Sequence, residues 1–473
     1  MPDKLISIDI KTIEGYRLFI KCKELPKYKI VGNNVVTDLL SYNYVFGGDE
    51  LEKIKHTNIG SEFDYQLYVI EKALDREKYA FFADCGIGKS VVELAFSHTI
   101  VEKTKSKALL LCPLGVMEDM QRECVRLYGY RMSNLRKEKW TTDVAIMNYE
   151  AMREIDMRNV NCLVLDESSI LKNGDGAIRK YLTEMAYNVR YRLACSATPS
   201  PNEQTEYGTH AVWLDIASTL KEYYSRYFRK DGTKWLMKSH AQDAFYKNLA
   251  SWACYIQSPS MLGFEKGAEL DHEPNYIIQR TFCDQKYMPD GKLFSDTVDI
   301  KNANKIFTQL RSDKTEERFK LAIDRINGSK TIVWCSRNLE ETAFKNVLKC
   351  PVINGQTPIE KRVELMDAFR LGQIDKLISK PKVMGFGVNL PEAEAHLFSG
   401  YTFSFEAFYQ AVRRSHRYGR KGVLDVVIPV CEPEYPVWET IKNKLKTFKK
   451  DVLELQQRFF NEPQNIPHNT NNI

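Results

Sequence analysis

The sequence lacks the patterns that mark secreted, zinc-binding and membrane-spanning proteins. Its 11 cysteines are scattered, without a C-x-x-C pair or a Cys/His cluster at zinc spacing, which disfavours both a disulfide framework and a zinc site. No apolar run approaches the length needed to cross a membrane, and the first residues, MPDKLISIDIK, lack the basic and then apolar layout of a signal peptide. We therefore expect a cytoplasmic protein without a membrane partner.

A large excess of charge of one sign is also missing. The net charge is +6 over 473 residues, which permits a polyanionic partner such as nucleic acid without requiring one. A chain of this length is too long to fold around one hydrophobic core, and it suits two or three domains. Composition alone therefore leaves nucleic-acid binding open.

What the sequence does contain is an alternation of short apolar runs with helical stretches, in two sets. The first set reads YAFF, ALLLCP, VAIMNY, NCLVLD and YRLACS, and the second reads KTIVWC, CPVI, KLIS, AHLFS and LDVVIPV. Such alternation is typical of a parallel sheet with crossover helices. We predict an α/β fold with two domains of this kind, over residues 61–215 and 320–435.

The remaining segments are predicted to be accessory. Residues 1–60 include ISIDIKTI and YRLFIKCKEL, whose period-two alternation predicts a small strand-rich unit. Residues 216–319 are predicted to form a helical insert, rich in aromatic and basic side chains, and a linker. Residues 436–473 read as a basic C-terminal helix followed by a polar, Asn-rich and disordered tail.

The stretch FFADCGIGKSVVELAF has the chemistry of a phosphate-binding loop. Gly86 and Gly88 stand between an apolar run and a helical pattern, where a glycine-rich turn exposes backbone N–H groups at a helix N-terminus. Lys89 can reach the β and γ phosphates of a nucleotide, and the Ser90 hydroxyl can ligate Mg²⁺. The strict pattern G-x-x-x-x-G-K-[ST] expects glycine where this chain has Ala83, so the stretch alone also fits an ordinary strand-turn-helix.

Two adjacent acids, Asp166 and Glu167, follow the apolar run in NCLVLDESSILKN. At the C-terminal edge of a strand beside a phosphate loop, Asp166 can hold magnesium through water, and Glu167 can orient and deprotonate the attacking water. A solvated acidic turn is the alternative for two such acids alone. Their position downstream of the loop, after a buried strand, favours catalysis.

With YRLACSATPSPN the chain resembles the superfamily two helicases, and more closely their Swi/Snf-like branch. Ser196, Ala197 and Thr198 match the motif that couples hydrolysis to movement in that family, and FDYQ places Gln66 where the family recognises adenine. The family commonly carries alanine at the position of Ala83. The resemblance covers about residues 62–430, and it implies two tandem RecA-like domains, parallel sheets flanked by helices, that use ATP with Mg²⁺.

Further motifs of the family appear in the expected order. The stretches LLLCPLGVMEDMQRE, VAIMNYEAM, IVWCSRN, KPKVMGFGVNL and QAVRRSHRYGR resemble motif Ia, the strand-tracking element that follows it, and motifs IV, V and VI. The last of these places Gln410, Arg414 and Arg417 where the family carries its arginine fingers. A planar, permanently charged guanidinium suits the charge that spreads over a transferring phosphoryl group. Since the fingers and the phosphate loop lie on different domains, the resemblance implies catalysis on closure of the cleft between them.

Some positions depart from the family pattern. Ser168 and Ser169 stand where a histidine often links the acidic motif to the coupling motif. Arg413 and Arg420 do not match the finger positions, and we expect them at the surface. Segments such as DESSILK, KWLMKSHAQDAF and FSGYTFSFEAFYQAVRR resemble compact DEAD/DEAH-box-type helicases of bacteriophages and prophages. That resemblance implies a phage origin, with phage replication or recombination proteins as partners.

The resemblance also implies a nucleic-acid partner, contacted through its backbone and without sequence specificity. The candidate contacts are Tyr149, Arg229, Lys230, Lys234, Trp235 and Lys380. The aromatic side chains of the insert either stack on bases or fill a core. The Swi/Snf-like details favour DNA, we expect a duplex, and we expect the protein to be a monomer. Two alternatives stay open: an RNA helicase or remodeller, and an ATP-switched clamp that recruits a nuclease or methyltransferase.

Overall fold

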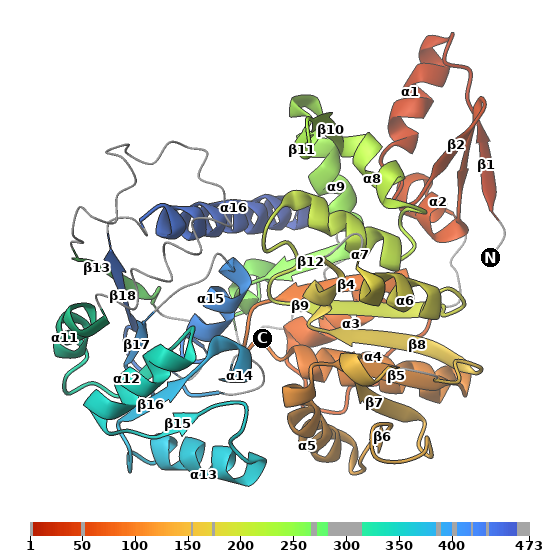
Figure 1. Ribbon diagram of the computed structural model, residues 1–473. Helices are drawn as coiled ribbons and strands as arrows, with labels where there is room; N and C mark the ends of the chain where they lie inside the picture. Colours follow the sequence, from red (N-terminus) through yellow and green to blue (C-terminus); the bar gives the residue numbers. More distant parts are fainter. Residues whose placement is uncertain are drawn as a thin grey trace, which may run out of the picture. The chain divides into compact units, whose positions relative to one another are not determined.

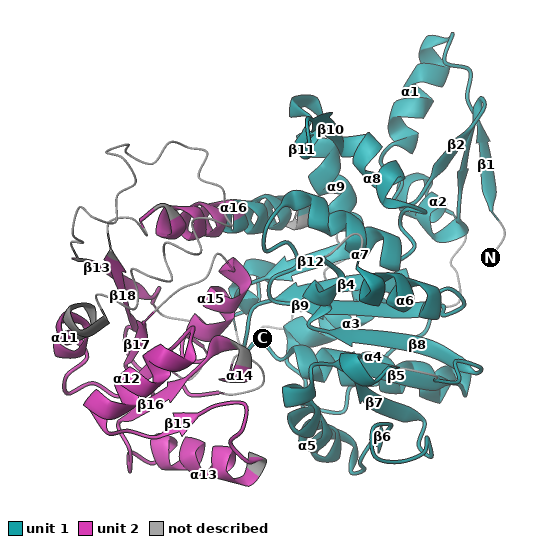
Figure 2. Ribbon diagram, in the orientation of Figure 1, with its two compact units in different colours: residues 1–267, 448–473 teal, residues 268–447 magenta. Residues whose placement is uncertain are grey.

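The computed structural model describes residues 3–48, 53–152, 155–172, 176–265, 272–281, 315–384, 389–399, 404–417, 420–431 and 435–460. Figure 2 shows the two compact units of the chain, residues 1–267 with 448–473 and residues 268–447. None of the described helices combines the length and the apolarity that a bilayer span requires. The predicted tail, the linker from 282 to 314 and GFGV of motif V lie outside the described residues.

The first unit is built on a seven-stranded sheet in which every neighbouring pair of strands is parallel. In spatial order the strands are β12 (Ala253–Ile256), β4 (Lys78–Ala83), β9 (Tyr191–Ser196), β8 (Val160–Asp166), β5 (Lys107–Cys112), β7 (Val144–Asn148) and β6 (Ser133–Asn134). The longer strands are buried almost throughout, as expected for a parallel sheet that is covered on both faces. The five apolar runs predicted as strands are confirmed.

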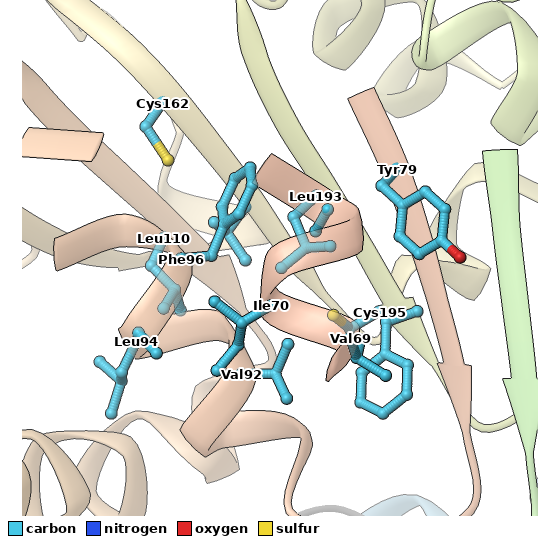
Figure 3. Packing of buried hydrophobic residues seen from close by; sticks show 14 of the residues in the cluster. Val69, Ile70, Tyr79, Val92, Leu94, Phe96, Leu110, Cys162, Leu193 and Cys195 are labelled. Carbon is cyan, nitrogen blue, oxygen red and sulfur yellow. The ribbon is translucent and has the colours of Figure 1, made fainter. Parts of the chain in front are cut away.

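Helices cover both faces of this sheet, as Figure 1 shows. They include α3 (Asp64–Arg76), α4 (Lys89–Thr104), α5 (Met117–Tyr128), α6 (Ala177–Met185), α7 (Tyr207–Trp213) and α9 (Gln242–Trp252), and α8 (Leu220–Tyr227) packs on α7 and α9. On one face, side chains of α3 and α4 join those of the strands in one core cluster, seen from close by in Figure 3. Phe82 faces the other side, with its ring centroid 6.0 Å from that of Tyr207 on α7.

The N-terminal residues form a small three-stranded antiparallel sheet with two helices. The elements are β1 (Lys4–Ser7), α1 (Ile13–Cys22), β2 (Lys29–Val31), β3 (Asn34–Thr37) and α2 (Leu39–Phe46). A strand predicted at YRLFIKCKEL is wrong, because most of that stretch lies in α1. The Thr12 side chain caps this helix by accepting from the Gly15 N–H at 3.0 Å, and Leu18 and Cys22 face the small core at helical spacing.

The insert was predicted to be helical, but it also contains strands. Between α8 and α9 lies an antiparallel hairpin of β10 (Phe228–Asp231) and β11 (Lys234–Met237). The residues that follow α9 form β12, which pairs with β4 in the sheet of the first unit. Tyr223, Tyr227 and Phe228 are buried around Phe245, so these aromatic side chains fill a core.

The second unit has a six-stranded sheet, again with every pair parallel. Its strands, in spatial order, are β13 (Asn275–Thr281), β18 (Asp425–Cys431), β17 (Ala395–Phe398), β14 (Thr331–Trp334), β16 (Lys376–Ser379) and β15 (Val352–Ile353). Its helices are α11 (Thr315–Arg325), α12 (Asn338–Leu348), α13 (Ile359–Arg370), α14 (Pro381–Met384), α15 (Phe405–Val412) and the first half of α16 (Tyr435–Phe460). Two parallel sheets flanked by helices confirm the predicted fold class.

Candidate nucleotide site

Three of the predicted motifs follow neighbouring strands at one edge of the first sheet. The glycine loop follows β4, the acidic pair stands at the end of β8, and Ser196 ends β9, which lies between the other two strands. The register places Phe82 opposite Ser196 and Asp166 opposite Cys195. Because the strands are parallel, their carboxyl ends meet at the same edge, where ligands of open α/β sheets bind.

The loop from Asp84 to Gly88 has a backbone that requires glycine at two positions. Gly86 and Gly88 have φ angles of 90° and 79°, in the left-handed region. A Cβ atom at Gly88 would also stand 2.2 Å from Nε2 of Gln66. The loop leads directly into α4 with Gly88 as its N-cap. Its N–H groups and the helix dipole together suit a phosphate.

Two residues of α3 brace this loop. The Tyr65 hydroxyl donates to the Ile87 carbonyl at 2.7 Å, and Nε2 of Gln66 lies 3.5 Å from the carbonyl oxygens of both Ile87 and Gly88. The Gln66 side chain also accepts from the Phe63 N–H at 2.9 Å. Gln66 is 2% exposed, and it contacts the phosphate loop itself. Its recognition of adenine stays a prediction.

Lys89 begins α4, and its ammonium group reaches back across the loop. Nζ donates to the carbonyl oxygens of Ala83 at 2.9 Å and Asp84 at 3.3 Å. Burial, the largest influence, would lower the pKa of Lys89, but the acidic groups around it, including Glu167 and Asp166, raise it above its ordinary value. The ammonium therefore stays charged beside the loop, as binding to nucleotide phosphates requires.

The acidic pair is held in place by its neighbours. Asp166 is 5% exposed, and its carbonyl accepts from the Tyr149 hydroxyl at 2.5 Å. Glu167 has a φ of 55°, a left-handed conformation that is uncommon outside glycine and concentrates at functional sites. The Ser196 hydroxyl donates to Glu167 Oε2 at 3.5 Å and accepts from the Thr198 N–H at 3.1 Å. The coupling motif is thus joined directly to the acidic pair.

Tyr149 was predicted to contact nucleic acid, and its position contradicts that role. The side chain is 4% exposed, because its ring is buried and its hydroxyl is directed at the Asp166 backbone. A buried ring cannot stack on a base without a large rearrangement. Tyr149 supports the acidic pair instead.

A histidine that the sequence did not single out also belongs to this cluster. His210 of α7 is fully buried, and a hydrogen bond of 3.1 Å joins its Nε2 atom to Ser168 Oγ. Its ring meets that of Phe82 edge-on at 5.2 Å. Burial lowers the pKa of His210 to about 4, so the ring is neutral near pH 7. A histidine from another element is therefore hydrogen-bonded to Ser168 of the acidic motif.

The same edge suits a magnesium ion that is shared with nucleotide phosphates. Ser90 lies in the first turn of α4, and Asp166 is near enough to Lys89 for its negative charge to raise the pKa of that lysine. Over the described ranges, no three His, Cys, Asp or Glu side chains are grouped to hold a metal by themselves. Mg²⁺ usually takes one or two protein carboxylates and completes its shell with phosphate oxygens and water. Ser90 and Asp166 fit such a partial set.

In the second unit, the predicted finger motif lies on α15 and in the turn that follows it. Gln410 and Arg414 are 2% and 6% exposed, and Arg417 is half-buried. The Arg414 carbonyl accepts from the Leu390 N–H at 2.9 Å, which ties this turn to the last residue of motif V. The catalytic roles of Gln410, Arg414 and Arg417 stay predictions.

The two arginines expected at the surface have structural roles, so that prediction is wrong. Arg413 is 7% exposed, and its guanidinium donates to the Tyr409 hydroxyl at 3.1 Å and also contacts His416. Arg420 is half-buried and donates to backbone carbonyls, including that of Gly422 at 3.0 Å. Burial of the charge lowers the pKa of Arg420. Both side chains brace their own unit.

Two family models match the chain: the SNF2-related domain over residues 75–251 and the Helicase conserved C-terminal domain over residues 313–419. The chain thus carries an SNF2-related domain followed by a helicase C-terminal domain. These matches support the resemblance to Swi/Snf-like helicases that the motifs of the sequence carry. The phosphate loop, the acidic pair and His210 all lie in the SNF2-related domain, and the finger motif lies in the helicase C-terminal domain.

Relatives of this class are similar over much of the chain. The SWI/SNF-related matrix-associated actin-dependent regulator of chromatin subfamily A-like protein 1 homolog of Caenorhabditis elegans is 22% identical, over 81% of this chain and 61% of that protein. The ISWI chromatin-remodeling complex ATPase ISW1 of Saccharomyces cerevisiae is 22% identical, over 79% of this chain and 38% of that protein. The chain therefore spans less than two thirds of either relative.

One solved structure and one further relative complete the comparison. The Sulfolobus solfataricus SWI2/SNF2 ATPase core in complex with dsDNA is similar over 88% of this chain and 97% of that chain, at 16% identity and a TM-score of 0.40. The TATA-binding protein-associated factor mot1 of Schizosaccharomyces pombe is 27% identical over 62% of this chain and 15% of that protein.

The predicted nucleic-acid contacts differ in their surroundings. In the SNF2-related domain, Arg229, Lys230 and Lys234 are exposed on the hairpin of β10 and β11, and Trp235 is half-buried. In the helicase C-terminal domain, Lys380 binds the Asn338 side chain and lies 3.6 Å from Glu341 Oε2. Lys380 is therefore engaged within its own domain, and the hairpin carries the exposed candidates.

Proposed function

We propose that the protein is an ATP-dependent helicase or duplex-DNA translocase of Swi/Snf-like type. The observation that supports this most strongly is the cluster of Lys89, Asp166 and Glu167 at the carboxyl edge of the sheet, inside an SNF2-related domain. Phosphoryl transfer to water needs a cation at the phosphates and carboxylates for the metal and the attacking water. The lysine at the glycine loop after β4 and the two acids at the end of β8 supply these groups.

Each site residue of the first unit has its own proposed role in ATP hydrolysis. The N–H groups of the glycine loop and the Lys89 ammonium bind and orient the phosphates of ATP. Ser90 and Asp166 would hold Mg²⁺, which neutralises charge on the phosphate oxygens when it is bound. Glu167 accepts a proton from the attacking water, and Ser196 keeps its carboxylate in position.

The arginines of the second unit complete the proposed site. Arg414 and Arg417 are proposed to stabilise the charge of the transferring phosphoryl group, with Gln410 beside them. Their support is their position in the motif of the helicase C-terminal domain. Hydrolysis then requires that the two units close on one nucleotide, and repeated closure and opening moves the enzyme along its polymer.

Duplex DNA is the proposed polymer. Two of the similar proteins are named as regulators or remodellers of chromatin, which contains duplex DNA. An enzyme can move along DNA by contacting only its phosphate backbone, without recognising bases, so sequence specificity is not expected. On the resemblance of its motifs to phage helicases, we place the activity in phage DNA replication, recombination or repair within the host cytoplasm.

Phosphate release measured with duplex DNA, single-stranded DNA, RNA and no polymer tests this proposal. We expect the strongest stimulation with duplex DNA, and displacement of a third strand from a triplex as the enzyme moves. Stimulation by RNA alone would contradict the DNA assignment. Equal, slow turnover with every polymer and with none would contradict translocation and favour an ATP-switched clamp.

A further inference from the structure

The hairpin of β10 and β11, residues 228–237, has two faces of different character; we call it the insert hairpin. Its register places Phe228 opposite Met237, Lys230 opposite Trp235, and Arg229 opposite Leu236. Directly opposite residues share a face, and successive residues alternate between faces. One face therefore carries Phe228, Lys230, Trp235 and Met237, and the other carries Arg229, Asp231, Lys234 and Leu236.

The aromatic side chains of the first face, those of Phe228 and Trp235, pack against the helices that flank the insert hairpin, whereas Lys230 on the same face is exposed. The ring centroid of Phe228 lies 5.7 Å from that of Phe245 on α9, and that of Trp235 lies 5.2 Å from that of Tyr224 on α8. The Lys238 ammonium donates to the Ser225 carbonyl at 2.7 Å and ties the end of β11 to α8. The hairpin is thus fixed at its base, and it stands at the end of α9 that is farther from the sheet (Figure 1).

The cations of the insert hairpin are left to solvent. Arg229, Lys230 and Lys234 are exposed, and within the described part of the chain no carboxylate lies within ion-pair distance of any of them. Arg226, one turn earlier on α8, contrasts with them, because it is bound to Glu222 and to the Tyr28 carbonyl. The three exposed cations are therefore charges of the insert hairpin that a polyanion can reach.

We propose that the insert hairpin binds the phosphate backbone of duplex DNA through Arg229, Lys230 and Lys234. This inference rests on the proposed function, and it names the surface that holds the polymer. Arginine and lysine contacts to phosphates position a protein without reading sequence. Single-strand binding by base stacking needs exposed aromatic faces, whereas Trp235 is packed on Tyr224, and the nearby rings of Tyr223, Tyr227 and Phe228 are buried.

The test compares the salt dependence of duplex binding between the wild type and the triple variant Arg229→Gln, Lys230→Gln, Lys234→Gln. Each lost phosphate contact lowers the slope of log K against log salt by about 0.9, or about 2.7 for three. A rise from 50 to 200 mM salt should then weaken wild-type binding about 40-fold more than it weakens the triple variant. The matched control is Lys105→Gln, Arg136→Gln, Lys139→Gln, which removes the same charges from exposed positions outside the hairpin.

The outcomes separate this inference from the proposed function. If the wild type shows no stimulation by duplex DNA, the proposed function fails. If the wild type is stimulated but the triple variant keeps the wild-type slope, or the control variant loses as much slope, the hairpin assignment fails. Thermal unfolding of both variants checks that each is folded. If Trp235→Leu loses single-strand binding while the triple variant keeps wild-type binding, the hairpin binds nucleic acid by base stacking, and the proposed backbone contact is wrong.

Discussion

The glycine loop of the first unit leads into a single cation, Lys89, whereas the arginine turn of the second unit carries several, and the partners of these cations differ. In the loop, Lys89 is half-buried and its ammonium donates to the carbonyl oxygens of Ala83 and Asp84, and Tyr65 and Gln66 brace the loop itself. In the turn, Arg413 is bound to Tyr409 and His416 and braces its own unit. A cation in a motif is thus not by itself a phosphate ligand, because the atoms around it decide its role.

The largest effect is expected from the loop. Lys89→Ala should lower ATP turnover by at least about a hundredfold, because no other charged group is held across the loop. Phosphate release measures this, and Lys103→Ala, at an exposed position near the end of the same helix, is the control. Full turnover by Lys89→Ala would end the assignment of the loop to phosphate binding.

The acidic pair should give the next largest effect. Glu167→Gln should lower hydrolysis by about 10²- to 10³-fold, since an amide cannot accept the proton of the attacking water. Binding of ATP should be kept, because the loop and Lys89 are unchanged. Equilibrium binding of a fluorescent ATP analogue checks that part, with Glu184→Gln on α6 as the control. Loss of nucleotide binding would assign Glu167 a different role.

A smaller effect separates the two roles considered for Tyr149. Tyr149→Phe removes the hydroxyl bonded to the Asp166 carbonyl, a loss of about 1 kcal/mol, and should lower turnover about fivefold. The concentration of duplex DNA that gives half-maximal stimulation should stay unchanged. The reverse result, weaker DNA stimulation with full turnover at saturation, would restore Tyr149 as a nucleic-acid contact.

The smallest effect on turnover is expected at His210. His210→Gln keeps a side chain that can hydrogen-bond Ser168, so turnover near pH 7.5 should stay within about threefold. The pKa of His210 is about 4 when folded and ordinarily about 6.5, so below pH 6.5 the unfolded chain binds a proton that the folded chain does not. Acidification from pH 6.5 to 4 therefore destabilises the wild type, by about 3 kcal/mol through this residue.

Unfolding temperatures at pH 8 and pH 5 test the linkage at His210. The variant, which lacks the titrating ring, should lose less stability on acidification than the wild type. Identical losses in the two proteins would mean that His210 is not buried as a neutral ring.

The sequence predicts local features better than long-range ones. The strands that end in the glycine loop, in Asp166 and in Ser196 are apparent from apolar runs with turn residues after them. The pairing of β12 with β4 is not, because it depends on packing between segments far apart in the chain. The same holds for His210, whose partner Ser168 lies 42 residues away and belongs to another element.

Short amphipathic stretches set a second limit on prediction. YRLFIKCKEL fits a strand by its alternation, yet it forms most of α1, because Leu18 and Cys22 also fit a helical face and Thr12 caps the start. The burial of Arg413 could not be predicted either, because a run of basic residues usually marks a solvated surface.

We propose that the loop of the first unit and the arginines of the second act on one nucleotide. Single-turnover hydrolysis by Arg417→Ala, measured beside its equilibrium affinity for ATP, tests this most directly. We expect hydrolysis to fall by about 10²-fold or more while ATP affinity stays within about threefold, because the loop still holds the phosphates. Hydrolysis at the wild-type rate would contradict it.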